Sequence, residues 1–420
     1  MKSLTKFLLA VVLASLIGHT QDAQSQEAKW RPLPLKRRIT HVQPMTGIVL
    51  WTTSKHNASD AIQLEYTYLG YNDVVSSQGI YDWSKVDTCL QAVAKRKHQA
   101  ILRFYDTYPD KTTTIPNYIK QLQDYKETHG KSEGKNTSFP DWSQEELKRF
   151  ILEFYQKFAA RYDTDSRLAF LQVGFGLWAE YHIYDGPFVL GKTFPAKDYQ
   201  EQFARHLDKT FQNTPWMISI DAADNKIAPY TEREGLLTLG FGLFDDSFLS
   251  KEHPKVNALN WKAIGHDRWK TAPAGGEFSY YTSRDQQLAL ASKGPHGVSF
   301  EQSARQFHIS FMIGNDQPQY QNKARIQQAG METGYRLRVT KWETNGAKAR
   351  VTVMNKGIAP LYHHAFFAAD GLRARESLRG ILPGESRTFT LATTRKAPKL
   401  TIESDRLVLG QSIEFEANLP

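Results

Sequence analysis

Residues 171–182 read LQVGFGLWAEYH, a run of strand-forming residues that ends in polar and aromatic side chains. Trp178, Glu180 and His182 follow the apolar part directly. Such an ending has two explanations. Either a buried strand reaches the solvent at this point, or it delivers a carboxylate to a site. The spacing and the ends of the other apolar runs in the chain distinguish between these explanations.

Seven further strand-like runs occur in the first 330 residues, at 47–51, 62–71, 100–106, 216–221, 236–246, 273–281 and 308–315. Helix-like segments or long polar stretches separate them. The clearest helix spans 142–162, where Ser143 and Glu146 form a capping-box pattern. Strand–helix alternation favours a parallel α/β fold, and eight units predict a closed (β/α)8 TIM barrel. No Gly-rich phosphate loop follows the first strand, which argues against a doubly wound nucleotide-binding fold.

After about residue 330 the pattern changes to short runs in which apolar and polar residues alternate, such as YRLRVTKW, KARVTVMN and RTFTLATT. Turn residues separate these runs. The spacing predicts a small C-terminal antiparallel β-sandwich. We therefore assign 26–330 to the barrel and 331–420 to the sandwich, with the boundary near Gly330–Gly334.

The first 25 residues have the pattern of a secretory signal peptide. Lys2 and Lys6 precede the apolar run FLLAVVLASLIG, and a small-x-small cleavage site follows at 23–25. The run is short for a permanent membrane span, so no membrane anchor is expected after cleavage. With a single cysteine in the chain, this pattern predicts a bacterial periplasmic or secreted protein.

The composition is that of a globular protein, with 420 residues, 40% hydrophobic and 23% charged. Because Cys89 is the single cysteine, no internal disulfide or cysteine-based zinc site can form. The net charge of +9 suits an acidic polymer, although a merely solvated surface explains it equally well. Nucleic acid is not an expected partner, since the basic residues are scattered apart from Lys36–Arg38 and no nucleic-acid motif is present.

In a (β/α)8 barrel the active site lies at the carboxyl ends of the strands. The runs end in carboxylates, amides and aromatic residues, which together suit a carbohydrate. Tryptophan and tyrosine stack on the apolar faces of sugar rings, while carboxylates and amides bind hydroxyl groups. The predicted substrate-binding residues are Asn72, Arg103, Tyr105, Asp106, Trp178, His182, Asp221, Asp246 and Asn315.

Glu180 and Glu277 are the predicted catalytic pair. Strands four and seven lie roughly across the barrel mouth, and two carboxyls on different strands can cleave a glycosidic bond. The glycines of GGEF at 275–278 allow a close approach to Glu277. No second histidine stands at ligand spacing from His182, so neither a metal nor another cofactor is expected.

The stretch QGIYDWSKVDTCLQAVAKRKHQAILRF resembles a pattern near the start of clan A glycoside hydrolases. In their order along the chain, LEYTYLGYNDV, GLWAEYH, LGFGLFDDSF, GGEF and NKGIAPLYHHAFF look like the DUF4832-type family of exported bacterial proteins, which is related to the β-galactosidase-like members of that clan. The resemblance implies a retaining hydrolase with Glu180 as acid/base and Glu277 as nucleophile. It also implies that Arg103 orients the nucleophile or a sugar hydroxyl.

One position departs from the clan pattern. Asparagine usually precedes the acid/base glutamate there, and this chain has Ala179. Another group, such as Asn72, Asp246 or His182, then takes over the contact to the sugar, or the substrate is unusual, or catalysis is lost.

Three functions stay open at this point. The first is a retaining glycoside hydrolase acting on a poly- or oligosaccharide, and the basic charge would suit an acidic or sulfated one. The second is a non-catalytic carbohydrate-binding protein on a barrel scaffold, which Ala179 favours. The third is a lyase-like enzyme that uses tyrosine and histidine on an acidic glycan.

Overall fold

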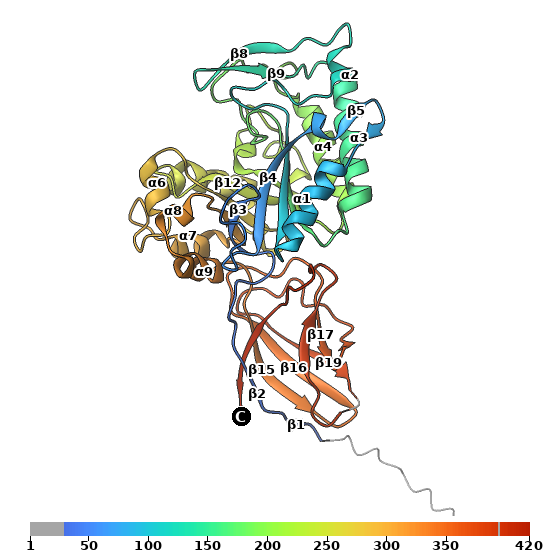
Figure 1. The fold of residues 1–420 in the computed structure, drawn as a ribbon, viewed down its shortest axis with the longest axis vertical. Coiled ribbons are helices and arrows are strands. Elements are labelled where there is room, and N and C mark those ends of the chain that lie inside the picture. The colour runs from blue at the N-terminus through green and yellow to red at the C-terminus, as the bar shows by residue number, and fades with distance from the viewer. Residues whose placement is uncertain (1–28, 394) are drawn as a thin grey trace, which may run out of the picture.

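The computed structural model describes residues 29–393 and 395–420, so the predicted signal peptide at 1–25 lies outside the described residues. Eight parallel strands form a closed barrel (Figure 1), and β14 pairs with β3 to complete it. This confirms the predicted (β/α)8 barrel. In chain order the strands are β3 (Gly47–Trp51), β4 (Leu64–Gly70), β7 (Gln99–Tyr105), β10 (Leu168–Gln172), β11 (Trp216–Ser219), β12 (Gly242–Phe248), β13 (Ala274–Phe278) and β14 (Phe311–Ile313).

Amphipathic helices cover the outside of the barrel. The longer ones are α1 (Ser84–Lys95), α3 (Glu145–Tyr162), α4 (Lys197–Thr210), α5 (Ala258–Gly265), α7 (Phe300–Phe307) and α9 (Lys323–Met331). Helix α3 begins one residue later than its capping-box pattern indicates, with Gln144 and not Ser143 as the N-cap. The side chain of Gln144 accepts from the backbone N–H of Glu146, while Ser143 donates to Asp141.

The barrel interior is a packed core and not a pore. Alternate strand residues fill it, among them Tyr66, Phe170, Phe244 and Phe311, and the rings of Phe170 and Phe311 stack with centroids 5.1 Å apart. Because apolar side chains occupy the middle of the barrel, a ligand can be bound only at one of its ends.

The connections after the strands build one end of the molecule. A hairpin of β8 (Thr128–Ser132) and β9 (Lys135–Phe139) follows β7 and stands beyond the carboxyl ends of the strands (Figure 1). This hairpin accounts for much of the long polar stretch between the third and fourth strands.

The second domain is a small sandwich of mainly antiparallel strands, as predicted. Its large sheet contains β15 (Leu337–Thr344), β16 (Lys348–Asn355), β19 (Ser386–Ala392) and β21 (Phe415–Leu419), and the smaller sheet contains β17 (Phe366–Ala369), β18 (Leu372–Arg373) and β20 (Leu400–Glu403). Two strands that precede the barrel, β1 (Arg31–Pro32) and β2 (Leu35–Arg37), also pair into the large sheet. The sandwich therefore takes strands from both ends of the chain.

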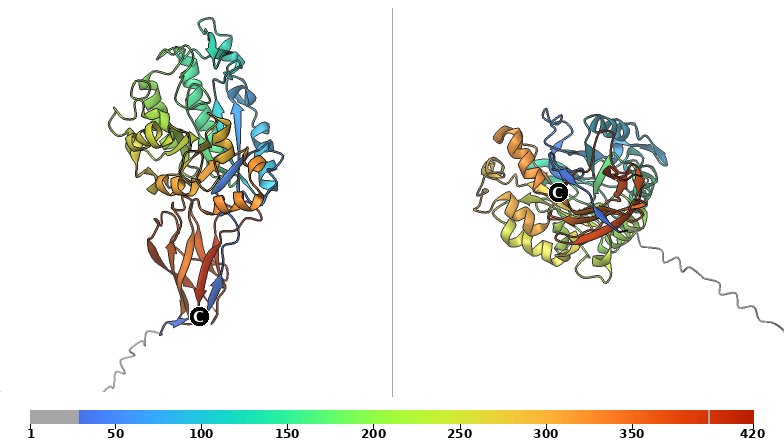
Figure 2. Two further views of the ribbon diagram at one scale, coloured as in Figure 1. Left: turned by 90° about the vertical axis from the view of Figure 1, so that its left-hand side faces the viewer. Right: turned by 90° about the horizontal axis from the view of Figure 1, so that it is seen from below.

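The sandwich covers the amino-terminal end of the barrel (Figure 2). The buried Arg406 donates to the carbonyls of Asp163 and Leu168 and to the hydroxyl of Thr214, all near the start of barrel strands. His363 is buried with its ring centroid 5.9 Å from that of Phe170 inside the barrel. With this end closed, the carboxyl ends of the strands are the open face.

We expect the substitution Arg406→Met to loosen the contact between the domains. It leaves buried acceptors without a donor, at a cost of about 3 kcal/mol in the free energy of unfolding. Thermal denaturation followed by circular dichroism should show a midpoint several degrees below that of the wild type. Arg375→Met, at an exposed arginine, is the matched control. Equal midpoints for the two variants would show that Arg406 does not brace the barrel.

Candidate active site

Arg103 lies at the centre of the open barrel end. It projects inward from β7, and its side chain has no exposed area. The guanidinium donates to Glu180 at 2.9 Å, to Asp246 at 2.6 Å and to Gln172 at 2.9 and 2.5 Å. It also lies over the ring of Phe244, 4.3 Å from the centroid. Three barrel strands and the loop after the fourth therefore converge on one cation.

Glu180 and Asp246 share this single guanidinium as ion pairs, and the charge of Arg103 also acts on Glu277, which makes no ion pair in the described structure. Asp246 lies in β12, two residues after the core residue Phe244, and its charge adds to the effect of burial in raising the pKa of both Glu180 and Glu277. Burial is the largest cause for each glutamate. It raises the pKa of Glu180 well above its ordinary value and the pKa of Glu277 to about 8. Arg103 opposes both shifts.

The charge of the cluster explains these shifts. Fully ionised, it would hold three negative charges and one positive charge in a nearly closed space, so at least one proton is retained at neutral pH. Asp246 makes the shorter contact to Arg103, whereas Glu277 makes no ion pair in the described structure and its Oε1 is buried without a hydrogen-bond partner. A pair of carboxyls that hold a proton at neutral pH can serve acid–base chemistry.

Glu180 does not end a strand, contrary to its predicted position. Strand β10 stops at Gln172, and Glu180 stands in a tight loop whose residues Trp178, Ala179 and Tyr181 have φ of +53°, +60° and +61°. Residues other than glycine rarely adopt this left-handed conformation, and a run of them is strained. The strained residues flank Glu180, whose carboxyl group pairs with Arg103.

Two glycines make the fold of this loop possible. A Cβ at Gly174 would lie 2.1 Å from the carbonyl oxygen of Ala179, and one at Gly176 would lie 2.3 Å from that of His182. The loop thus packs backbone against backbone. Ala179 is fully buried by this packing, so it presents no side chain at the surface of the site.

His182 and Asp221 extend the cluster on the side of Glu180. His182 Nδ1 lies 2.8 Å from a carboxyl oxygen of Asp221, and Nε2 lies 3.9 Å from Glu180. Asp221 is 38% exposed, whereas Glu180 is 14% exposed. Because Asp221 fixes the histidine ring, Nε2 faces Glu180 with no hydrogen-bond partner of its own in the structure.

Aromatic side chains surround the carboxyls. Trp51, Tyr66 and Tyr68 form an edge-to-face group with centroids 5.2–5.7 Å apart, and the hydroxyl of Tyr68 accepts from Arg103. Trp178 stacks on Tyr184 at 6.1 Å and 17°. Burial is the main cause that raises the pKa of the Tyr108 hydroxyl, and the charges of Glu277 and Glu180 add to it.

The structure places four of the predicted binding residues away from Arg103. Asn72 is exposed on a short turn after β4. Tyr105 belongs to the aromatic rim, with its ring centroid 5.8 Å from that of Tyr68. Asp106 is buried, and burial raises its pKa to about 7, but its charge acts on Tyr71 and Tyr155 between the barrel and α3. Asn315 accepts from the backbone N–H of Trp51 at 3.2 Å.

Gln172, Tyr68 and Trp51 contribute to the site without having been predicted from the sequence. Gln172 is fully buried at the end of β10 and accepts both of its hydrogen bonds from Arg103. A glutamine inside an otherwise apolar strand, LAFLQ, is a signal that could have found it, because a buried amide needs a partner.

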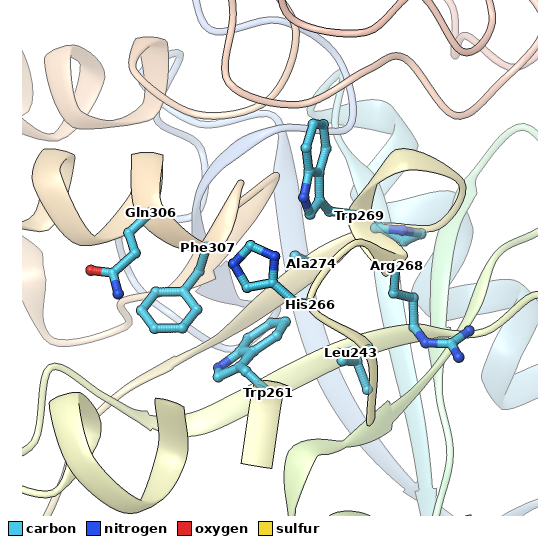
Figure 3. Close-up of a pocket in the computed structure, with 10 residues that line it drawn as sticks. Leu243, Trp261, His266, Arg268, Trp269, Ala274, Gln306 and Phe307 are labelled. Carbon is cyan, nitrogen blue, oxygen red and sulfur yellow. The ribbon is translucent and has the colours of Figure 1, made fainter. Parts of the chain in front are cut away.

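A small apolar hollow on the side of the barrel is not part of this site. Trp261, His266 and Phe307 gather around it (Figure 3), and its volume is about 10 Å³. That is scarcely room for one water molecule. Within residues 29–393 and 395–420, no group of three or more histidine, cysteine or acidic side chains is arranged to hold a metal ion. No helix in those ranges is long and apolar enough to cross a membrane.

No protein-family model matches the chain, and no curated protein resembles it in sequence, so membership of the DUF4832-type family stays a prediction. Among solved structures, the α-galactosidase TtGalA from Thermus thermophilus has a TM-score of 0.39 at 12% identity, covering 76% of this chain and 66% of that one. An α-galactosidase from Lactobacillus brevis has a TM-score of 0.38 at 10% identity, covering 87% and 55%.

The catalytic domain of a β-amylase from Paenibacillus polymyxa also has a TM-score of 0.38 at 10% identity, covering 65% of this chain and 92% of that one. The chain spans between about half and two thirds of the length of the galactosidases. Similarity of this degree does not identify a reaction.

We expect Glu277→Gln to stabilise the protein increasingly as the pH rises. The pKa of Glu277 is about 8 in the folded protein and about 4.5 when it is solvated, so between these values the folded protein keeps a proton that the unfolded chain has lost. Stability contributed by that proton falls as the pH rises through this window, and glutamine has no proton to lose.

The difference between the midpoints of variant and wild type in thermal unfolding should therefore be more positive at pH 8 than at pH 5. Glu252→Gln, at an exposed glutamate, should show no such trend. A difference that is constant with pH would mean that Glu277 titrates as an ordinary surface carboxyl.

Proposed function

We propose that this protein is an exported retaining glycoside hydrolase that acts on a poly- or oligosaccharide. One observation carries the proposal: Glu180, Asp246 and Glu277 gather around Arg103 at the open end of the barrel, within an aromatic rim. Buried carboxyls with raised pKa values suit acid–base chemistry on an uncharged bond. Exposed and half-buried aromatic rings suit the apolar faces of sugars. The pattern of residues 1–25 supports export.

In the proposed cycle Glu180 is the acid/base and Glu277 the nucleophile. The ionised carboxylate of Glu277 attacks the anomeric carbon, while Glu180 gives its proton to the departing glycosidic oxygen. Glu180 then takes a proton from water, and the resulting hydroxide releases the sugar from Glu277. Both groups are restored at the end.

Arg103 and Asp246 position this pair. Arg103 holds Glu180 directly, and the charge of Asp246 favours the protonated form of both glutamates. In the clan, an asparagine before the acid/base binds the sugar. Since Ala179 is buried, we assign that contact to His182 and Asp246, which both lie beside Glu180, in preference to Asn72.

A non-catalytic carbohydrate-binding protein is the second candidate. The absence of an amide at position 179 favours it, because the barrel could have kept its sugar site and lost turnover. The two candidates differ in whether any glycosidic bond is cleaved.

Hydrolysis of aryl glycosides and of neutral and acidic polysaccharides is the direct test. We expect turnover by the wild type, and a fall in kcat/KM of at least about a thousandfold in both Glu180→Gln and Glu277→Gln. Glu252→Gln should keep full activity. Activity that survives both site substitutions would place the chemistry elsewhere. No turnover, with glycan binding equal in all four proteins, would establish the binding protein.

The pH dependence tests the assigned roles. The nucleophile must be ionised, and the pKa of Glu277 is about 8, so kcat/KM of the free enzyme should rise with pH up to about 8. Glu180, held protonated by burial, stays competent as an acid over that range. A profile measured on the best aryl glycoside gives the answer. An acidic limb near pH 4–5, the range of solvated carboxyls, would contradict this assignment.

A further inference from the structure

An open groove of about 700 Å³ runs along one side of the sandwich. Five cationic residues line it, together with one acidic residue, Glu416, and the amide of Asn418; the cations are Lys36, Arg37, Arg38, Arg336 and Arg338. The sandwich lies at the amino-terminal end of the barrel (Figure 2), whereas the candidate active site is at the carboxyl ends of the strands. The groove is therefore separate from the candidate active site.

The sheet topology creates this concentration of charge. Strand β2 pairs with β21, which pairs with β15, so that Lys36 stands beside Asn418 and Arg338 beside Glu416. In β15 and β21 the residues on either side of Arg338 and Glu416 are buried in the sandwich core. Alternation along the strands then turns the charged side chains outward. The basic run 36–38 is the one basic cluster visible in the sequence. The fold places it beside two further arginines, Arg336 and Arg338.

These cations are poorly neutralised. Lys36, Arg37 and Arg38 are exposed and make no ion pair with any described residue. Arg336 and Arg338 share Glu416 at 3.5 and 3.9 Å, which is a loose contact. The neighbouring acids are already engaged: Glu414 with Thr40 and His41, and Glu343 with Arg350. Like charges held close together destabilise a fold unless a counter-charge meets them.

We propose that this groove binds the sulfate or carboxylate groups of an anionic polysaccharide. Arginine side chains form paired hydrogen bonds with both kinds of group, and Asn418 can bind sugar hydroxyls. A nucleic acid fits less well, because single strands are held by stacking on aromatic rings and the groove has none. The inference goes beyond the proposed function, since binding in the groove requires no cleavage.

The experiment measures the affinity of the full mature protein for carrageenan, polygalacturonate and a neutral galactan, by affinity electrophoresis and calorimetry. The first two probes distinguish sulfate from carboxylate. The test variants are the triple substitution Lys36→Gln, Arg37→Gln, Arg38→Gln, and separately the double substitution Arg336→Gln, Arg338→Gln on the other wall. The control removes the same charge as the triple variant from exposed lysines on the barrel, by Lys251→Gln, Lys255→Gln, Lys262→Gln.

We expect at least tenfold weaker binding of one anionic probe in both groove variants, unchanged binding in the control, and affinity that falls with added salt. No binding of either anionic probe, or equal loss in the control, would overturn the proposal. Tighter binding of a single-stranded DNA oligomer that depends on the same residues would overturn it in favour of nucleic acid. Binding without hydrolysis would sustain the groove while refuting the proposed function.

Discussion

The burial of Arg103 is the constraint on which the rest of the site depends. A guanidinium without solvent needs partners, and removing any of them leaves a costly unpaired charge. Its partners come from β10, from the loop after β10 and from β12, so the cation ties the fourth and sixth barrel strands to the third. The rings of Phe244 and Tyr68 lie against it, with centroids 4.3 and 5.2 Å from the guanidinium carbon, and help to keep water away. The positions of Glu180 and Asp246 thus follow from one buried charge.

The same interaction stabilises a loop that is unfavourable by itself. Trp178, Ala179 and Tyr181 are left-handed, and such conformations cost of order 1–3 kcal/mol each. The backbone carbonyl of Trp178 accepts from Arg103, while the N–H of Trp178 donates to Thr107 after β7. The contact to Arg103 and the backbone packing at Gly174 offset that cost. A relaxed loop would carry Glu180 away from the cation, so strain and charge placement are linked.

The architecture could be predicted from the sequence because strand and helix periodicities are local. All eight strand-like runs overlap barrel strands, and the arrangement of their ends identified Arg103, Asp246 and Glu277. The loop that carries Glu180 was beyond such reasoning, since its conformation depends on glycine contacts and on Arg103. Asp106 shows a second limit. Asp106 comes directly after Tyr105, and the side chains of Arg103 and Tyr105 both point into the barrel. Because side chains alternate along a strand, Asp106 points to the outside of the barrel, where its charge adds to burial in raising the pKa of Tyr155.

The two ends of the molecule carry opposite charge, and this difference limits which ligands each end can bind. At the mouth, three carboxyls face a single guanidinium, and an anionic group brought there would meet repulsion in a medium of low dielectric. For the proposed hydrolase, the sugar at the bond to be cleaved is therefore best uncharged, and the rings of Trp178 and Tyr184 would suit its apolar face. The sandwich groove has the opposite balance, with five cations and one acidic residue, Glu416, in its lining. A polymer with both neutral and anionic units could place a neutral sugar at the barrel mouth and an anionic group in the sandwich groove. A uniformly anionic chain would fit the groove alone.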